Sequence, residues 1–278
     1  MFKGTENSMS SGTALITGAS SGIGAIYADR LARRGHDLIL VARNRERLDA
    51  LARCLSDDTG RAVTIIVADL NDKADLARIE QVLRSDASIT VLVNNAGIAM
   101  TGDLANTDPN RLDSMIHVNV LAPSRLALAA IPGFVARGRG TLITISSALA
   151  LGPEWSNGSY SGSKAYLLNL SLRLQQERAG KGVHVQVVLP GATRTALWEK
   201  AGTDIASLPP SVVMDVDEMV DAALAGLDSG ELVTIPALPD KADWEAYEAA
   251  RQSLRPNLSR SVRAARYGVR ALNPKGGG

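Results

Sequence analysis

Short apolar runs alternate with longer amphipathic segments from residue 13 to residue 235, and this alternation limits the possible folds of the chain more than any other feature. The apolar runs are rich in Val, Ile, Leu and Thr and are bounded by Gly, Asn or charged residues, a pattern typical of buried strands. Seven such strands are predicted, at residues 13–17, 38–41, 63–67, 89–93, 141–145, 183–189 and 232–235.

The segments between these strands have helical spacing. Helices are predicted at residues 23–34, 45–55, 72–83, 108–137, 160–179 and 215–227. Because helices that connect parallel strands cover both faces of a sheet, this order predicts an α/β fold, a doubly wound Rossmann-like three-layer sandwich with a seven-stranded parallel sheet. Pro132 is expected to end or bend its helix. The longest irregular segment, residues 192–214, is a candidate lid.

Composition argues against several classes of partner. The chain has 30 basic and 29 acidic residues and a net charge of +1. A charge this small gives the whole protein no electrostatic field that would attract nucleic acid or an anionic membrane. The single Cys54 cannot form an internal disulfide, and three scattered histidines indicate no metal site. No apolar run is long enough to predict a membrane span, and the polar first 11 residues do not resemble an export signal. We therefore expect a cytoplasmic protein.

Three glycines, Gly18, Gly22 and Gly24, follow the first predicted strand at G-x-x-x-G-x-G spacing. They lie between a strand and a helix, where free backbone N–H groups and a helix N-terminus can bind a pyrophosphate. The same predicted phosphate-binding turn contains Ser20, Ser21 and Ile23. The spacing differs from the G-x-G-x-x-G of the ordinary dinucleotide fingerprint, and a lone Gly/Ser turn is often only a turn.

This turn resembles that of the short-chain dehydrogenase/reductase family, whose pattern TGxxxGIG is present here from Thr17 to Gly24. More motifs of that family follow predicted strands in the family's order: Asp69-Leu70, Asn94-Asn95-Ala96-Gly97 and residues 190–195. The resemblance implies further cofactor contacts at Asp69, Leu70, Asn95, Ala96, Gly97, Pro190, Gly191, Thr193 and Thr195. A strand-ending turn would explain the double Asn alone, but not all of these motifs together.

The end of the second predicted strand indicates which nicotinamide cofactor is bound. Folds that prefer NAD place an acid there for the ribose 2′-hydroxyl, whereas an Arg accommodates a 2′-phosphate. This strand ends with Arg43 and has no acid, which predicts NADP(H). The alternative is that Arg43, Arg45 and Arg47 only begin a solvated charged helix. Ser21 occupies a position where many NADP-using members of the family carry a second basic residue.

Tyr160 and Lys164 form a Y-x-x-x-K pair on one face of a predicted helix. A free tyrosine titrates near pH ~10, and an adjacent ammonium is expected to lower the pKa of Tyr160 and make it a better acid/base group. A solvent-facing aromatic beside a surface lysine would give the same bare motif. Ser147, which precedes Tyr160 by thirteen residues, matches the Ser-to-Tyr interval of the family.

The resemblance implies a catalytic group of Asn119, Ser147, Tyr160 and Lys164. Tyr160 would be the general acid in carbonyl reduction and the base in alcohol oxidation, and Ser147 would hydrogen-bond the substrate oxygen. Tyr160 and Lys164 would also contact the cofactor, Lys164 at the nicotinamide ribose. Asn119 would hold a water of a proton relay; the alternative is a polar residue that only bends its helix. The hydride belongs to the cofactor.

The predicted function is therefore an NADP(H)-dependent oxidoreductase that transfers hydride between the nicotinamide and an apolar carbonyl or alcohol substrate. Several apolar residues near the motifs favour such a substrate, although core packing explains them equally well: Leu149, Leu151, Trp155, Leu197 and Trp198. A catalytically silent NADP(H)-sensing regulator is the alternative, but it has no need of the Ser/Tyr/Lys set. A sugar-nucleotide epimerase would need a separate substrate domain, for which the chain has little length.

The motifs and strand order predict one Rossmann-like catalytic domain over residues 12–236 and a C-terminal extension, partly helical or disordered, over residues 237–278. Residues 251–278 carry a charge of +7, against −6 for the rest of the chain. Helical spacing would place four arginines of this tail on one basic face: Arg260, Arg263, Arg266 and Arg270.

The family resemblance also implies a homodimer or homotetramer. In such an assembly the helices at 108–131 and 160–178 would pack against a symmetry mate, which would bury helical faces that lack a partner within the chain.

Overall fold

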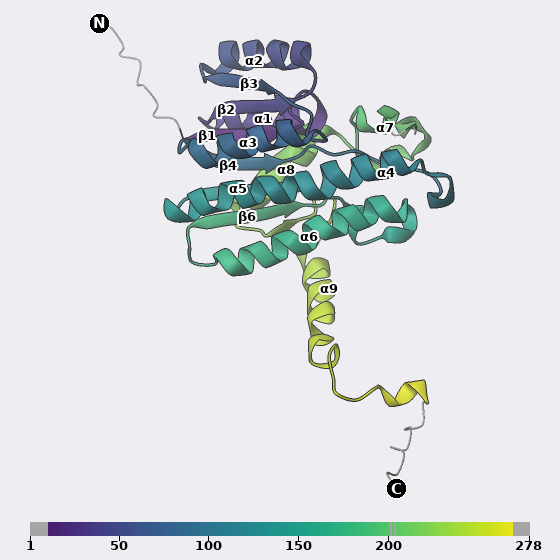
Figure 1. Cartoon of the computed structure of the whole chain (residues 1–278). Coiled ribbons are helices and arrows are strands. Elements are labelled where there is room, and N and C mark those ends of the chain that lie inside the picture. Colours follow the sequence, from purple (N-terminus) through teal and green to yellow (C-terminus); the bar gives the residue numbers. More distant parts are fainter. Residues whose placement is uncertain (1–10, 201, 203, 269–278) are drawn as a thin grey trace, which may run out of the picture. The chain divides into compact units, whose positions relative to one another are not determined.

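The structure is a computed structural model that describes residues 11–200, 202 and 204–268. Its main sheet has seven parallel strands in the order β3-β2-β1-β4-β5-β6-β9. Figure 1 labels β3, β2, β1, β4 and β6 in this order across the sheet. The strands are β1 (Thr13–Thr17), β2 (Asp37–Ala42), β3 (Val63–Val67), β4 (Ile89–Asn94), β5 (Gly140–Ile145), β6 (Val183–Val188) and β9 (Val233–Thr234). The predicted fold class, a doubly wound seven-stranded parallel sheet, is confirmed.

The central strands bury both of their faces. In β1, Ala14 and Ile16 contribute to one hydrophobic core, and Leu15 between them contributes to the other. β2 alternates in the same way, with Leu40 in the first core and Val41 in the second. Because successive side chains of a strand point to opposite faces, strands with several consecutive apolar residues require helices on both sides.

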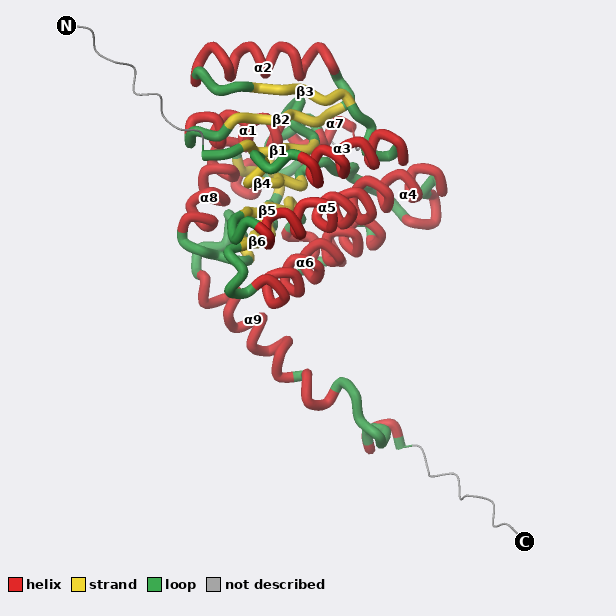
Figure 2. The backbone as a smooth tube through the Cα atoms, turned by 60° about the vertical axis from the view of Figure 1, so that its left-hand side comes forward, coloured by secondary structure: helices red, strands yellow, loops and turns green. Residues whose placement is uncertain are grey.

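Two sets of helices supply that cover, as Figure 2 shows for α1 and α8 on one side of the strands and α3, α5 and α6 on the other. The first core contains residues of α1 (Gly22–Arg33), α2 (Arg45–Thr59) and α8 (Val216–Asp228). The second core contains residues of α3 (Lys73–Ser85), α5 (Ala122–Ala136) and α6 (Gly158–Arg178).

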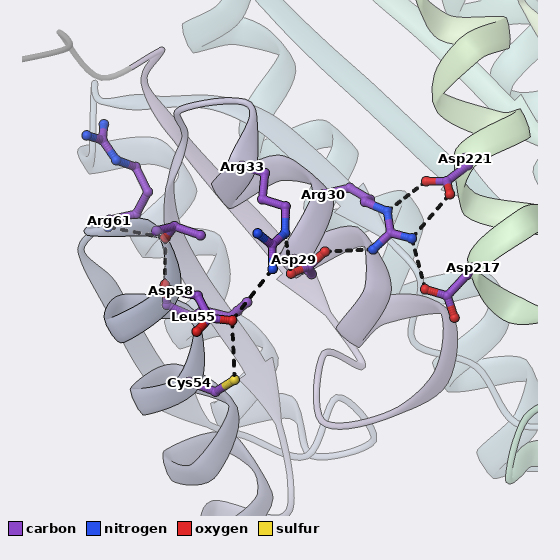
Figure 3. A network of polar contacts seen from close by, with 10 residues as sticks. Asp29, Arg30, Arg33, Cys54, Leu55, Asp58, Arg61, Asp217 and Asp221 are labelled. Carbon is purple, nitrogen blue, oxygen red and sulfur yellow. Dashed lines mark hydrogen bonds and ion pairs between the residues drawn. The ribbon is translucent and has the colours of Figure 1, made fainter.

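An ion-pair network connects α1 to α8 on the outside of the first core (Figure 3). The guanidinium of Arg30 lies 2.7 Å from a carboxylate oxygen of Asp221, 2.9 Å from Asp217 and 2.7 Å from Asp29. Asp217 and Asp221 are more than half exposed, and ion pairs with such solvated carboxylates each contribute about 0 to 1 kcal/mol. The network therefore orients the two helices more than it stabilises the fold.

The helical segment that contains Pro132 differs from the prediction. It does not end at Pro132: α5 continues to Ala136, and the helix is interrupted instead by a π-helical turn at His117–Leu121, after α4 (Pro109–Ile116). Proline removes one backbone hydrogen bond, but the buried Ile131 and Phe134 on either side of Pro132 hold this turn of α5 against the sheet.

By length and composition, one helical stretch of the described chain, Pro109–Ala136, is long and apolar enough to cross a membrane. Of its most apolar window, 56% is buried inside the protein, and α5 packs into the second core. A core helix of a globular domain meets the same criterion of length and composition.

The segment expected to be irregular, residues 192–214, contains short regular elements. β7 (Ala192–Thr193) pairs in parallel with β8 (Val213–Met214), so that the two ends of the segment are joined. The described residues between them include the short helix α7 (Leu197–Lys200) and 3-10 turns at Ile205–Ser207 and Pro210–Val212. The segment is therefore a loop after β6 whose two ends are held together by strand pairing.

A second compact unit begins at Leu238. It contains α9 (Lys241–Ser253), whose N-terminus is capped by the side chain of Asp240. The expected basic helical face does not form, because only short 3-10 turns at Arg255–Asn257 and Ala265–Tyr267 follow α9 in the described residues. No helix connects Arg260, Arg263 and Arg266, and Arg270 lies outside the described residues.

Candidate active site

A large cavity lies at the carboxyl ends of the parallel strands, where ligands of such sheets bind. Its volume is about 1540 Å³, above the 300 to 1,000 Å³ or so of ordinary small-molecule pockets. Of the predicted catalytic and cofactor-binding residues, only Gly24 and Asn119 are absent from its wall. In the part of the chain that the structure describes, no group of three or more His, Cys, Asp or Glu side chains could hold a metal ion.

The glycine turn forms one end of this cavity. Gly18 has φ +67°, a left-handed conformation that glycine adopts without strain. A Cβ at Gly24 would lie 2.5 Å from the carbonyl oxygen of Gly18, so only glycine lets α1 begin this close to β1. Ser21 is the N-cap of α1, but its side chain makes no capping hydrogen bond. The hydroxyl of Ser21 and the first N–H groups of α1 can therefore bind an anion in the cavity.

Thr17 and Asn95 hold the ends of β1 and β4 together. The backbone N–H groups of Asn95 and Ala96 donate to the Thr17 hydroxyl over 3.0 and 3.1 Å, and Asn95 Nδ2 donates to the Thr17 carbonyl over 2.8 Å. The side-chain amide of Asn95 therefore holds the start of the glycine turn by hydrogen bonds to the carbonyls of Thr17 and Gly18. Our sequence analysis did not assign a role to Thr17, although it is the first residue of the TGxxxGIG pattern.

Charged residues gather where β2 and β3 end. Arg43 and Asp69 both line the cavity, and an Arg43 guanidinium nitrogen lies 3.7 Å from an Asp69 carboxylate oxygen. The Arg43 side chain is 68% exposed, so a ligand can reach it. Arg47, on the first turn of α2, lines the same part of the cavity.

Tyr160 and Lys164 lie one turn apart on α6, and both line the cavity with Ser147. The Lys164 ammonium lies 5.7 Å from the centre of the Tyr160 ring and donates a hydrogen bond of 3.1 Å to the carbonyl oxygen of Ile145, the last residue of β5. Ser147 follows β5 by two residues. The parallel order therefore brings the end of one strand to the start of the helix that carries the Tyr/Lys pair.

The protonation states of this pair are set mainly by burial. Burial raises the pKa of Tyr160 to about 12, and its hydrogen bond with Ser147 acts in the opposite direction. Burial lowers the pKa of Lys164 to about 8. The expected lowering of the Tyr160 pKa by Lys164 is not found: the opposing influence is the Ser147 hydrogen bond, and a low-dielectric site disfavours the phenolate more than Ser147 stabilises it. Tyr160 is a protonated phenol at neutral pH and can donate a proton.

Asn119 lies in the π-helical turn, behind the wall of the cavity rather than on it. Its Oδ1 accepts a 2.8 Å hydrogen bond from the Ile98 backbone N–H, and its Nδ2 donates to the Ile98 carbonyl over 2.9 Å. A Cβ on the neighbouring Gly97 would lie 3.4 Å from Asn119 Oδ1 and 3.6 Å from Lys164 Nζ. These are ordinary van der Waals distances, so the loop after β4 lies close to both side chains and would have room for a Cβ at residue 97.

Two buried hydroxyls that sequence reasoning missed support the Tyr/Lys helix. Ser146 Oγ donates to the backbone carbonyl of Lys164 over 2.7 Å. Ser163 Oγ donates to the carbonyl of Tyr160 over 2.7 Å and accepts from Asn119 Nδ2 over 3.2 Å. The only sequence signal for either residue is its position directly beside a motif residue.

The remaining wall of the cavity is mainly apolar. It includes Met100, Leu149, Trp155, Leu197, Trp198, Leu208 and Val212. Trp155 is 74% exposed although it lines the cavity, which places it at the opening to solvent. Large apolar side chains exposed at a cavity opening are typical of sites that bind apolar ligands.

The profile of the short chain dehydrogenase family matches residues 12–206, more than half of the chain. The chain belongs to the short-chain dehydrogenase family. This assignment confirms the resemblance noted in the TGxxxGIG, NNAG and YxxxK motifs, and it makes the protein a member of an oxidoreductase family.

Solved structures of other short-chain dehydrogenases are similar over most of the chain. A short-chain dehydrogenase from Sphingobium yanoikuyae in complex with NADPH has a TM-score of 0.89 and 49% identity, covering 92% of this chain and 100% of its own. A bulky-bulky ketone specific alcohol dehydrogenase from Comamonas testosteroni has a TM-score of 0.85 and 44% identity, covering 92% of this chain and 98% of its own.

Curated short-chain dehydrogenases match over a smaller part of their length. The human inactive hydroxysteroid dehydrogenase-like protein 1 is 34% identical over 186 residues, 66% of this chain and 56% of that protein. Human 17-beta-hydroxysteroid dehydrogenase type 3 is 33% identical over 214 residues, 76% of this chain and 66% of that protein. The match thus spans little more than half of the first relative and about two thirds of the second.

Proposed function

We propose that the protein is an NADP(H)-dependent oxidoreductase that interconverts an apolar ketone and its secondary alcohol. The observation that carries this proposal is that Tyr160, Lys164 and Ser147 line one cavity whose remaining wall is mainly apolar. When bound, NADPH supplies the hydride that is added to the carbonyl carbon. The Tyr160 phenol donates its proton to the carbonyl oxygen, and Ser147 donates a hydrogen bond to the same oxygen.

The residues at the phosphate end fit a dinucleotide. Ser21 and the N-terminus of α1 offer hydrogen-bond donors to a pyrophosphate, and Arg43 offers a cation at the end of β2, where no acid is present. The Sphingobium relative was solved with NADPH, which supports the same phosphorylated cofactor here.

The substrate that we propose is a ketone with a large apolar group on each side of the carbonyl. The cavity is large enough for a substrate beside the cofactor, and exposed Trp155 extends its apolar wall to the solvent. The Comamonas relative, 44% identical, is described as specific for bulky-bulky ketones, which agrees with a wall of this kind.

A catalytically silent NADP(H)-binding protein is the second candidate, because one human relative is named inactive. A panel of ketones with two large groups, small ketones, aldehydes and 3-oxoacyl thioesters, assayed by NADPH consumption, separates the two functions. We expect turnover to be highest with the ketones that carry two large groups. NADPH binding without turnover on any member of the panel would favour the silent protein instead.

The proposed assembly is a homodimer or homotetramer. Leu121 and Leu128, in the π-helical turn and α5, and Tyr166 in α6 are exposed, Leu128 by 70%, and Tyr166 forms a 3.1 Å hydrogen bond with Ser124 of α5. Burial of apolar side chains of this size would stabilise a symmetric contact. Light scattering at micromolar concentration should give about twice or four times the mass of one chain. The mass of a single chain would contradict the proposal.

A further inference from the structure

Arg43 is partly neutralised where it faces the cavity. Its guanidinium is 3.7 Å from the Asp69 carboxylate, and both residues line the same end of the cavity. Together the two side chains carry no net charge. The 2′-phosphate of NADP(H) is nearly a dianion, with a charge of about −1.5 to −2. Arg43 with Asp69 beside it is therefore a poor match for that group.

Arg47 is a second cation in the wall of the cavity, four residues after Arg43. It lines the cavity together with Arg43 and Asn44, and it forms no ion pair with any residue that the structure describes. Its backbone N–H donates to Asn44 Oδ1 over 2.9 Å, which fixes the first turn of α2 and with it the place where the Arg47 side chain begins. The end of the cavity thereby gains a net charge of +1.

The glycine turn, which lines the cavity with residues of the loop after β2, contributes no cation among the described residues. Of the described residues that line the cavity, the remaining cation is Lys164, which lies beside Tyr160. Ser21, in the glycine turn, is uncharged. Its uncapped hydroxyl can donate one hydrogen bond to a phosphate but adds no charge. A second cation for the phosphate must therefore come from the α2 side of the cavity.

We propose that Arg47 is the second cation that binds the 2′-phosphate of NADP(H), and that the preference for this cofactor depends on Arg47 as well as on Arg43. This inference rests on the proposed NADP(H) dependence and names the residue that decides it. Arg45, two residues away on the same turn of α2, is exposed but is not part of the cavity wall. Arg45 is therefore a matched control for a general loss of positive charge.

Calorimetric titrations with NADP⁺ and NAD⁺ test the proposal without an assay of turnover. Arg47→Ala should weaken NADP⁺ binding by about ten-fold or more, the effect of losing a charge-assisted hydrogen bond, and leave NAD⁺ binding unchanged. Arg45→Ala should change neither affinity. Raising the salt concentration should reduce the difference between wild type and Arg47→Ala, because the arginines at this end are exposed and are screened.

The outcomes separate this inference from the proposed function. If the wild-type protein prefers NADP⁺ and Arg47→Ala keeps that preference, or if Arg45→Ala weakens NADP⁺ binding equally, the role of Arg47 is refuted and the proposed function stands. If Arg47→Ala weakens NADP⁺ and NAD⁺ binding alike, the side chain does not act on the phosphate. A wild-type protein that binds NAD⁺ as tightly as NADP⁺ would overturn the cofactor proposal together with this one.

Discussion

Tyr160→Phe is expected to lower turnover about 10²- to 10⁴-fold and to leave the fold and NADPH binding intact, because the change removes a proton donor and almost no volume. Burial holds the pKa of Tyr160 at about 12, so the wild-type phenol is protonated at neutral pH and can donate to the carbonyl oxygen. The measurement is steady-state NADPH consumption with the best ketone of the panel, beside a fluorescence titration of NADPH.

Tyr166→Phe is the matched control for this prediction. Tyr166 is on the same helix, but it is partly exposed, hydrogen-bonded to Ser124 and not part of the cavity wall. Its loss of a hydroxyl should leave turnover per active site unchanged. If Tyr160→Phe keeps more than about a tenth of wild-type turnover, its residual activity is far above the expected level. The proposed proton transfer would then be wrong, even if the cofactor assignment is right.

Lys164→Ala should lower turnover by about 10²-fold or more and weaken NADPH binding in the same variant. Its ammonium would stabilise the phenolate that forms when Tyr160 gives up its proton, and by family resemblance it also binds the nicotinamide ribose. Steady-state kinetics and the NADPH titration measure the two effects separately. Unchanged NADPH binding in this variant would contradict the ribose contact.

The pH dependence of reduction should reflect the same lysine. Burial lowers the pKa of Lys164 to about 8, so the ammonium is present below that pH and is lost above it. The value of kcat/KM for reduction is therefore expected to fall as the pH rises through about 8, since this parameter reports groups of the free enzyme. In Lys164→Arg the guanidinium stays charged, so the fall near pH 8 should disappear from the residual activity. A fall that persists in Lys164→Arg would assign it to another group.

The strands could be predicted closely because their signal is local. Each predicted strand agrees with the structure to within one residue at each end. The reason is that a short run of Val, Ile and Leu between polar residues is typical of a buried strand. Helix ends were less certain. α2 continues to Thr59, four residues beyond its predicted end, and stops at Gly60, whose φ of +67° is typical of a glycine that ends a helix.

The interruption of the helix from 109 to 136 could not be predicted from the sequence. Pro132 is the strongest local signal for a break, yet the structure places the irregular turn at His117–Leu121, around Asn119. π-Helical turns of this kind are often found at functional sites. The interactions of this turn lie outside the helix and could not be read from its own residues: the Asn119 side chain hydrogen-bonds the backbone of Ile98, in the loop after β4.

By itself the sequence determined the order of strands and helices, the family, and the identity of the residues that meet at the carboxyl edge of the sheet, because all of these follow from periodicity and from short spacings along the chain. Only the tertiary structure decided that burial rather than Lys164 sets the pKa of Tyr160, that Asp69 lies beside Arg43, and that Ser146 and Ser163 hold the Tyr/Lys helix. These properties depend on burial and on distances between segments far apart in the chain, and a linear pattern contains neither quantity.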